Sequence, residues 1–188
     1  MIAPKPTFMI LDGHSMAYRH YHGMRDATLT SPLGEPVGAV FAFARQLMDI
    51  IYKQKPEYIA VAFDAGLSGR DVQFGDYKAH RPETPHELSV QVDKMREVIQ
   101  AYNIPILELA GFEADDVIGT VSRQASAQGI AVQIITGDSD LLQLITDDVQ
   151  VYLHRPFKEP LLHDKEAFHH KYGLRLPQQL IDLKALEG

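Results

Sequence analysis

The stretch EADDVIGTVSRQASAQGIAVQIITGDSDLLQL, residues 113–144, contains the features that decide the fold. Its first half, residues 113–128, is helix-like and is followed by Gly129, a residue that favours the end of a helix. Residues 132–135 form a short apolar run, which is typical of a buried strand. A polar turn at residues 136–138 follows, and a second, short helix is expected after it. The stretch therefore predicts a helix, a buried strand and a polar turn at the carboxyl end of that strand.

The same alternation continues on both sides of this stretch. Short apolar runs predict further strands at residues 8–11, 58–63, 104–107 and 149–153. Helix-like runs predict helices at residues 15–24, 37–52, 87–102, 164–171 and 177–186. Strand, helix, strand, helix is the pattern of a mostly parallel sheet that is covered by helices on both faces. We therefore expect an α/β fold whose site lies at the carboxyl ends of the strands.

The composition is that of an ordinary globular protein, because 45% of the 188 residues are hydrophobic and 23% are charged. The sequence has no Cys, which excludes disulfides, zinc–thiolate sites and thiol nucleophiles. No apolar run approaches the roughly 20 residues of a membrane span, and the N-terminus lacks the apolar stretch of a secretory signal. We therefore expect a cytoplasmic protein with no membrane partner.

The net charge is concentrated in one part of the chain. The 18 Lys and Arg residues against 25 Asp and Glu residues give −7, a weak argument against a general polyanion binder. Residues 111–148, however, hold seven carboxylates and one basic residue, Arg123, and so account for −6 of that charge. The charge therefore points to a local acidic site and not to an acidic surface.

Three acids stand at or just past the ends of predicted strands. These are Asp12, Asp64 and Asp138. Any one of them alone would be read as an ordinary turn residue or helix N-cap. The carboxyl ends of parallel strands share one edge of the sheet, so all three together predict a site at that edge.

Further acids crowd the starts of two predicted helices. Glu113, Asp115 and Asp116 fall within four positions, and Asp140 follows Asp138 closely, which is more acid than helix capping requires. Carboxylates gathered at one edge repel one another unless their pKa values rise or divalent cations bind. Mg²⁺ and Mn²⁺ prefer carboxylate and water ligands. The spacing therefore predicts an acidic Mg²⁺ or Mn²⁺ site, whose common use is two-metal phosphoryl chemistry.

The segment from residue 66 to residue 85 has no clear period and contains three Gly, two Pro and several charges. A stretch of this length without its own pattern is usually a functional loop or lid. From the pattern alone, Lys78 and Arg81 are equally compatible with solvated loop charges and with phosphate contacts.

At this point the residues resemble a known family, the N-terminal 5′-nuclease domains of bacterial DNA polymerases I, which are flap endonucleases with a PIN-like fold. The most specific similarity lies in GFEADDV at residues 111–117 and TGDSDLLQL at residues 136–144. The other similar stretches are LDGH at 11–14, AYR at 17–19, GEPV at 34–37, AFDA at 62–65, YKAHR at 77–81 and KYGL at 171–174. They are collinear and span essentially the whole chain.

The resemblance implies one 5′-nuclease PIN-like domain over residues 1–188, with a helical arch or lid at about residues 66–95. It implies two Mg²⁺ or Mn²⁺ ions held by Asp12, Asp64, Glu113, Asp115, Asp116, Asp138 and Asp140. It implies that Lys78 and Arg81 are catalytic residues at the scissile phosphate. It also implies DNA contacts by Tyr18, Arg19, Arg70, Tyr77, Lys78 and Arg81.

The implied activity is 5′-3′ exonuclease and flap-endonuclease cleavage of DNA in replication and repair. The expected substrate is DNA with a 5′ flap, a nick or a 5′ end, and the chain is expected to be a monomer. In the family, the stretch similar to residues 186–188 is followed by an Asp-rich segment and a helix-hairpin-helix that grips duplex DNA. This sequence stops at Gly188, so we expect a fragment of a longer protein with a polymerase region and weak or no activity from this chain alone.

Two alternatives stay open at this point. A PIN-type ribonuclease would share the acidic edge, although compact members of that class lack the long arch with Tyr77, Lys78 and Arg81. A non-catalytic nucleic-acid-binding fragment would share the fold without cleaving its ligand.

Overall fold

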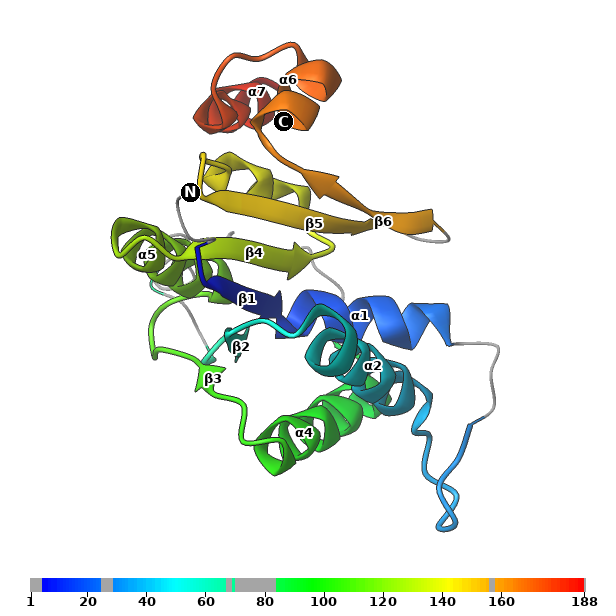
Figure 1. The fold of residues 1–188 in the computed structure, drawn as a ribbon. Helices are drawn as coiled ribbons and strands as arrows, with labels where there is room; N and C mark the ends of the chain where they lie inside the picture. Colours follow the sequence, from blue (N-terminus) through cyan, green and yellow to red (C-terminus); the bar gives the residue numbers. More distant parts are fainter. Residues whose placement is uncertain (1–4, 25–28, 67–68, 70–83, 156–157, 188) are drawn as a thin grey trace.

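The computed structural model describes residues 5–24, 29–66, 69, 84–155 and 158–187, which build one six-stranded sheet with helices on both sides (Figure 1). The strand order is β3-β2-β1-β4-β5-β6. All neighbouring strands are parallel except β5 and β6, which form an antiparallel pair. The strands are β1 (Thr7–Asp12), β2 (Tyr58–Ala62), β3 (Ile106–Leu107), β4 (Ala131–Thr136), β5 (Val149–Arg155) and β6 (Lys158–His163).

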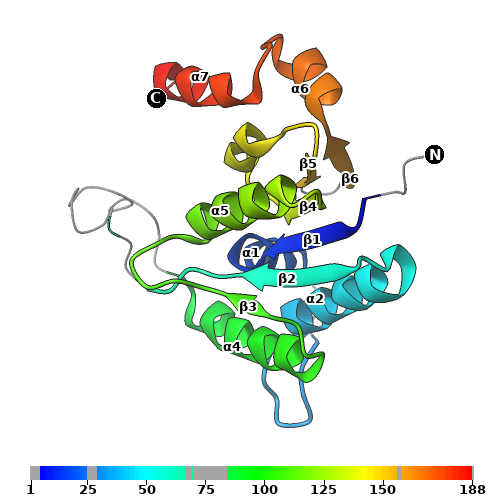
Figure 2. The same cartoon turned by 60° about the vertical axis from the view of Figure 1, so that its left-hand side comes forward.

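The helices are divided between the two faces of the sheet, and Figure 2 shows the two layers from another side. On one face lie α1 (Gly13–Gly23), α2 (Gly38–Asp49) with the π-helical turn η1 (Ile50–Gln54), and α4 (His86–Ala101). On the other lie α5 (Ala114–Ala127), the 3₁₀ helix η2 (Ser139–Leu144), α6 (Lys165–Tyr172), η3 (Pro177–Gln179) and α7 (Leu180–Glu187).

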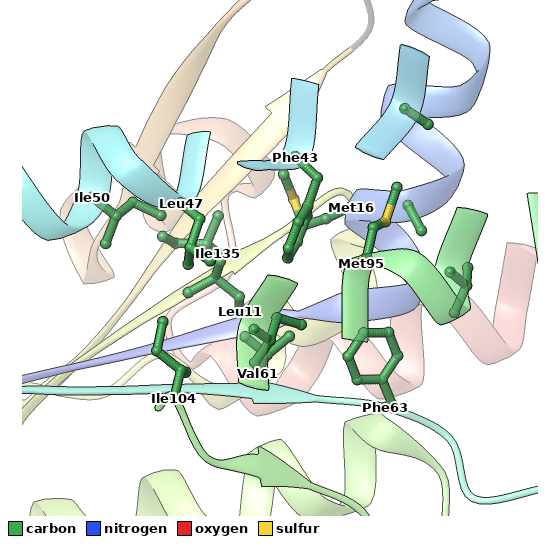
Figure 3. Packing of buried hydrophobic residues seen from close by; sticks show 14 of the residues in the cluster. Leu11, Met16, Phe43, Leu47, Ile50, Val61, Phe63, Met95, Ile104 and Ile135 are labelled. Carbon is green, nitrogen blue, oxygen red and sulfur yellow. The ribbon is translucent and has the colours of Figure 1, made fainter. Parts of the chain in front are cut away.

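The alternation of side chains along the central strand explains this arrangement. Met9 and Leu11 of β1 pack against α1, α2 and α4, whereas Ile10 packs against α5 and η2 on the opposite face. Both faces are apolar because both are covered, as expected for a parallel strand. Figure 3 shows the first of the two clusters, in which helix side chains such as Phe43 and Met95 cover the strands.

The α/β fold expected from the sequence is confirmed, and the differences are local. The prediction missed β6, where Pro160 and the preceding charges obscured the strand pattern. Pro is tolerated there because β6 lies at the edge of the sheet. The helix predicted over 177–186 is split into η3 and α7. Gly129 follows α5 with a φ of 78°, a left-handed conformation that ends a helix readily.

The segment expected to form the arch falls into two parts. Residues 67–68 and 70–83 lie outside the described residues. Residues 86–95, which the family resemblance predicts to belong to the arch, form the first part of α4. Their side chains Leu88, Val92 and Met95 are buried in the core, because α4 repeats its apolar positions at helical spacing. This part is therefore a core helix.

Within the described residues, no helix is long and apolar enough to cross a membrane.

Candidate acidic site at the carboxyl edge of the sheet

The ends of three adjacent strands bring three acids to one edge of the sheet. Asp12 is the last residue of β1, Asp64 lies two residues beyond β2, and Asp138 lies two residues beyond β4. Because β1 pairs with β2 on one side and with β4 on the other, the three ends are neighbours. An open groove at this edge is lined by all three side chains. We call it the acidic groove.

Asp12 is the most buried acid of the groove, with 4% of its surface exposed. Its Oδ1 accepts the backbone N–H of Ser15 at 3.0 Å, which caps α1, and its Oδ2 accepts the hydroxyl of Thr136 at 2.7 Å. Burial, followed by the charges of Asp138 and Asp64, raises the pKa of Asp12 to about 6, although the two hydrogen bonds act in the opposite direction. The side chain is thus held in place while its negative charge is poorly stabilised.

Asp64 ties the end of β2 to the start of α5. Its Oδ1 accepts the backbone N–H of Ala114 at 2.7 Å, at the N-terminus of α5, where N–H groups lack partners within the helix. The backbone N–H of Asp64 donates to Nδ1 of His14 at 3.2 Å. His14 Nδ1 is therefore an acceptor, and its 3.6 Å approach to Asp64 Oδ2 is not a hydrogen bond.

The three acids at the start of α5 have different surroundings. Asp116 Oδ2 accepts the backbone N–H of Glu113 at 3.2 Å and so helps to cap the helix. Glu113 occupies the N-cap position and is 7% exposed. Within the described part of the chain, Asp115 has no hydrogen bond or ion pair. Both Asp115 and Asp116 line the groove, but one carboxylate oxygen of Asp116 is used by the helix cap.

The electrostatic centre of the groove is Asp115. Burial raises the pKa of Asp115 to about 7, and the remaining causes are the negative charges of Asp12, Asp138, Asp64 and Glu113, in that order. Four other carboxylates therefore lie within electrostatic range of this one. Such a cluster is stable only with protons or cations to offset its charge.

Asp138 and Asp140 also line the groove, and Asp140 contacts a residue that could not be recognised from the sequence. Asp138 Oδ1 accepts the backbone N–H of Asp140 at 2.8 Å. Asp140 Oδ1 forms an ion pair with Lys184 Nζ at 2.8 Å, which raises the pKa of Lys184. Lys184 also donates to Ser139 Oγ at 3.3 Å. The lysine comes from α7, and nothing in its local sequence distinguishes it from a solvated helix residue.

Replacing Lys184 with Gln is expected to strengthen divalent-cation binding about threefold, on the order of 0.7 kcal/mol for an exposed ion pair. The ammonium group and a cation compete for the Asp140 carboxylate, so its removal frees that ligand. Isothermal titration calorimetry with Mn²⁺ measures the change. Lys165→Gln is the matched control, because Lys165 pairs at 2.8 Å with Asp147, an acid outside this groove. Equal or weaker binding by Lys184→Gln would contradict the competition.

The structure places the predicted site residues in three groups. Within the described residues, all seven predicted metal ligands line the acidic groove; they are Asp12, Asp64, Glu113, Asp115, Asp116, Asp138 and Asp140. Tyr18 also lines it, and its hydroxyl lies 2.7 Å from Thr84 Oγ1. Arg19 lines a different groove. Arg70, Tyr77, Lys78 and Arg81 lie outside the described residues.

The carboxylates share the groove without forming a preassembled metal site. Among the described residues, no three His, Asp or Glu side chains are gathered in the way that holding one ion requires. The assignment of individual metal ligands therefore stays a prediction.

The mostly parallel sheet, the two helical layers and the acidic groove together define an α/β protein of the PIN-like class. Residues 7–173 match the family described as the 5′-3′ exonuclease, N-terminal resolvase-like domain, and the chain belongs to this family. The resemblance inferred from the sequence is thereby confirmed.

The chain is similar to much longer proteins. It is 44% identical over 186 residues to a DNA polymerase I of Chloroflexus aurantiacus, covering 97% of this chain and 20% of that protein. It is 38% identical over 183 residues to a 5′-3′ exonuclease of Aquifex aeolicus, covering 97% of this chain and 61% of that protein. The chain thus spans about a fifth of the polymerase relative and about three fifths of the exonuclease.

Solved structures share the fold. The T5 D15 protein crystallised with metal ions superposes with a TM-score of 0.74 at 20% identity, covering 97% of this chain and 66% of that one. A complex of the T5 D15 flap endonuclease with DNA and metal ions gives a TM-score of 0.71 at 19% identity, with coverage of 97% and 66%. At these identities the similarity establishes the architecture.

Proposed function

We propose that the acidic groove is the centre of a divalent-metal-dependent nuclease that hydrolyses phosphodiester bonds at the 5′ end or 5′ flap of DNA. The observation that carries this proposal is the convergence of four carboxylates on Asp115, with a pKa raised to about 7. The names of the relatives support the same activity, since they include DNA polymerase I and 5′-3′ exonuclease.

The residues present suit Mg²⁺ or Mn²⁺. The groove offers carboxylate oxygens, which hard divalent cations prefer, and the sequence has no Cys that would favour a softer metal. Cation binding is proposed to draw the carboxylates of the groove together. We assign the ligands to Asp12, Asp64, Glu113, Asp115, Asp116, Asp138 and Asp140.

When bound, a pair of such ions supplies an activated water and stabilises the leaving oxygen. The chain's own residues orient the ligands. Thr136 and the Ser15 N–H fix both oxygens of Asp12, and the Ala114 N–H fixes one oxygen of Asp64. Preorganised ligands lose less conformational entropy on binding. To bind a cation, Asp116 has to give up its hydrogen bond in the helix cap. Asp140 has to give up its ion pair with Lys184.

The substrate-contacting residues are proposed in two sets. Tyr18 lines the groove, and its ring is proposed to stack on a base of a single strand. Lys78 and Arg81 are proposed to hold the scissile phosphate, and Arg70 and Tyr77 to contact the same strand. These four assignments stand on the family resemblance.

The setting proposed for this activity is replication and repair in the bacterial cytoplasm. The partner is DNA with a 5′ flap, nick or 5′ end, and the polymerase region of the longer relatives is the proposed neighbour in a full-length protein. The chain is proposed to act as a monomer.

The test is cleavage of a 5′-flap DNA in the presence of Mg²⁺ or Mn²⁺, beside a single-stranded RNA of the same sequence. Two proteins are compared: this chain, and a chimera that continues after Gly188 with the next segment of the Chloroflexus relative. The chimera is expected to cleave the flap at least tenfold faster than the RNA, and this chain alone to cleave weakly or not at all.

Three outcomes would contradict parts of this proposal. Faster cleavage of RNA would favour a PIN-type ribonuclease. No metal-dependent cleavage by the chimera, with flap binding retained, would favour a non-catalytic DNA-binding domain. Equal rates for the chimera and this chain would contradict the need for the following segment.

A further inference from the structure

A second groove lies between α1, α2 and the ends of β4 and β5. It has a volume of about 610 Å³ and belongs to the helical layer on the side of the sheet opposite α5. Arg19 and His20 of α1, Arg45 and Gln46 of α2, and His154 of β5 are among the residues that line it. We call it the α1/α2 groove. None of its lining residues belongs to the acidic groove.

A glutamine amide joins two histidines in this groove. Gln46 Oε1 lies 2.7 Å from His20 Nε2, and Gln46 Nε2 lies 3.2 Å from His154 Nε2. An amide oxygen only accepts and an amide nitrogen only donates, so His20 Nε2 donates and His154 Nε2 accepts. A neutral His154 therefore carries its proton on Nδ1.

That proton has no acceptor in the described part of the chain. His154 is 8% exposed, and its Nδ1 is buried without a hydrogen-bond partner. Burial, followed by the charges of Arg19 and His20, lowers the pKa of His154 to about 4, so the ring stays neutral near pH 7. A buried donor left unpaired costs on the order of 1–3 kcal/mol, which an acceptor brought by a ligand would recover.

The charges that line the groove favour an anion. Arg45 is exposed and has no ion pair with any described residue, and Arg19 adds a second guanidinium. Among the described residues that line the groove, the one acid is Asp49, whose carboxylate pairs at 2.9 Å with Lys53 one helical turn away. Guanidinium groups match phosphate oxygens in charge and geometry.

Aromatic surface lies beside these charges. Phe41 is 53% exposed, and Tyr152 is partly buried in the wall of the same groove. Exposed aromatic rings next to cationic groups suit a nucleobase attached to a phosphate, because every base has a face that stacks. Inorganic phosphate would use the guanidinium groups and leave the rings without a partner.

We propose that the α1/α2 groove is a second nucleotide-binding site, which takes a phosphate-bearing nucleotide, either free or as part of a DNA strand, on Arg45, Arg19 and the Gln46–His154 pair. This site is separate from the nuclease centre and needs no divalent cation.

The test is an NMR titration of the ¹⁵N-labelled chain with thymidine 5′-monophosphate in EDTA at pH 7. EDTA removes cations from the acidic groove, whose negative charge then repels the nucleotide. Saturable shifts are expected at the His154 ring nitrogens and at Arg45. Thymidine without phosphate and inorganic phosphate are each expected to bind at least fivefold more weakly. An eight-residue single-stranded DNA in a further titration distinguishes a strand from a free nucleotide.

Arg45→Gln is expected to weaken nucleotide or strand binding at least fivefold. Arg45 is exposed, so the variant should fold normally. Arg175→Gln is the matched control, because Arg175 is also exposed and lies in neither groove. Equal binding by the two variants, or no saturable shift with the mononucleotide or the strand, would overturn the proposal. Since no metal is present, that failure would leave the proposed nuclease activity untouched.

Discussion

Asp115→Asn is expected to lower metal-dependent cleavage at least a hundredfold and, at the same time, to stabilise the metal-free protein. Both effects follow from the position of Asp115 at the electrostatic centre of the acidic groove. The amide keeps the size of the side chain and removes its charge, so it weakens cation binding and relieves the repulsion. A gain in stability with a loss of activity is a common trade-off at functional sites.

The pH dependence of the stabilising effect has a definite sign. The pKa of Asp115 is raised from 3.8 to about 7 in the folded chain, so the folded state binds the proton more tightly than the unfolded state. The stability of the folded chain therefore falls as the pH rises from about 4 to about 7. Above that range Asp115 is ionised, and its destabilising effect is fully present. At pH 8 in EDTA, the free energy of unfolding of Asp115→Asn should exceed that of the wild type by about 2 kcal/mol. This is less than the full pKa shift of Asp115 corresponds to, because the side chain is only partly buried and solvent screens its charge.

Urea unfolding in EDTA at pH 8 and at pH 4.5 measures this gain, and cleavage assays of the variant in the flap-cleaving chimera measure the activity. The difference between wild type and variant should shrink at pH 4.5. Asp182→Asn, which removes an exposed acid of α7 outside the groove, is the control and should change neither quantity. If the variant is less stable than the wild type at pH 8, or if it keeps its activity, Asp115 is not the electrostatic centre of the site.

The strand ends and their acids could be predicted because they follow from chain order. Asp12 and Asp64 come directly after apolar runs, and Asp138 lies in the polar turn after another; parallel strands bring such positions to one edge whatever the details of packing. The sheet and its two helical layers followed from the same alternation. This part of the site needed no tertiary information.

The roles within the site could not be predicted, since they depend on tertiary contacts. Helical spacing puts Asp115 and Asp116 in the same turn, but the hydrogen bond to Glu113 that occupies Asp116 depends on the local geometry of the cap. Lys184 reaches Asp140 only because α7 packs on η2, a contact between segments far apart in sequence. Arg19 directly follows Tyr18 in sequence, yet the two line different grooves because successive helical residues point about 100° apart.

Gly13→Ala is expected to destabilise the chain by about 3 kcal/mol, near the upper end of the usual cost of overpacking a core. A Cβ at residue 13 would lie 2.5 Å from Cε1 and 2.5 Å from Cζ of Phe63, far inside van der Waals contact. The ring has little room to move. It is fully buried, the guanidinium of Arg96 lies 4.3 Å from its centroid, and the His14 ring packs edge-on at 5.2 Å.

The crowding of Gly13 against Phe63 also affects the acidic groove, because Gly13 lies between Asp12 and His14, which line that groove, at the start of α1. Gly23→Ala, in the same helix, places its added Cβ more than 4 Å from any described atom outside the backbone of that helix and the neighbouring residues, so it should be neutral or up to about 1 kcal/mol stabilising. Phe63→Leu removes the ring atoms that the new methyl group meets, so Gly13→Ala should cost at least 1 kcal/mol less in that background. Urea unfolding of the four proteins in this cycle measures the coupling. If Gly13→Ala lowers the free energy of unfolding by the same amount with Leu at position 63, a clash with the Phe63 ring is not the cause of the destabilisation. The glycine is then required for the backbone of the turn that positions Asp12.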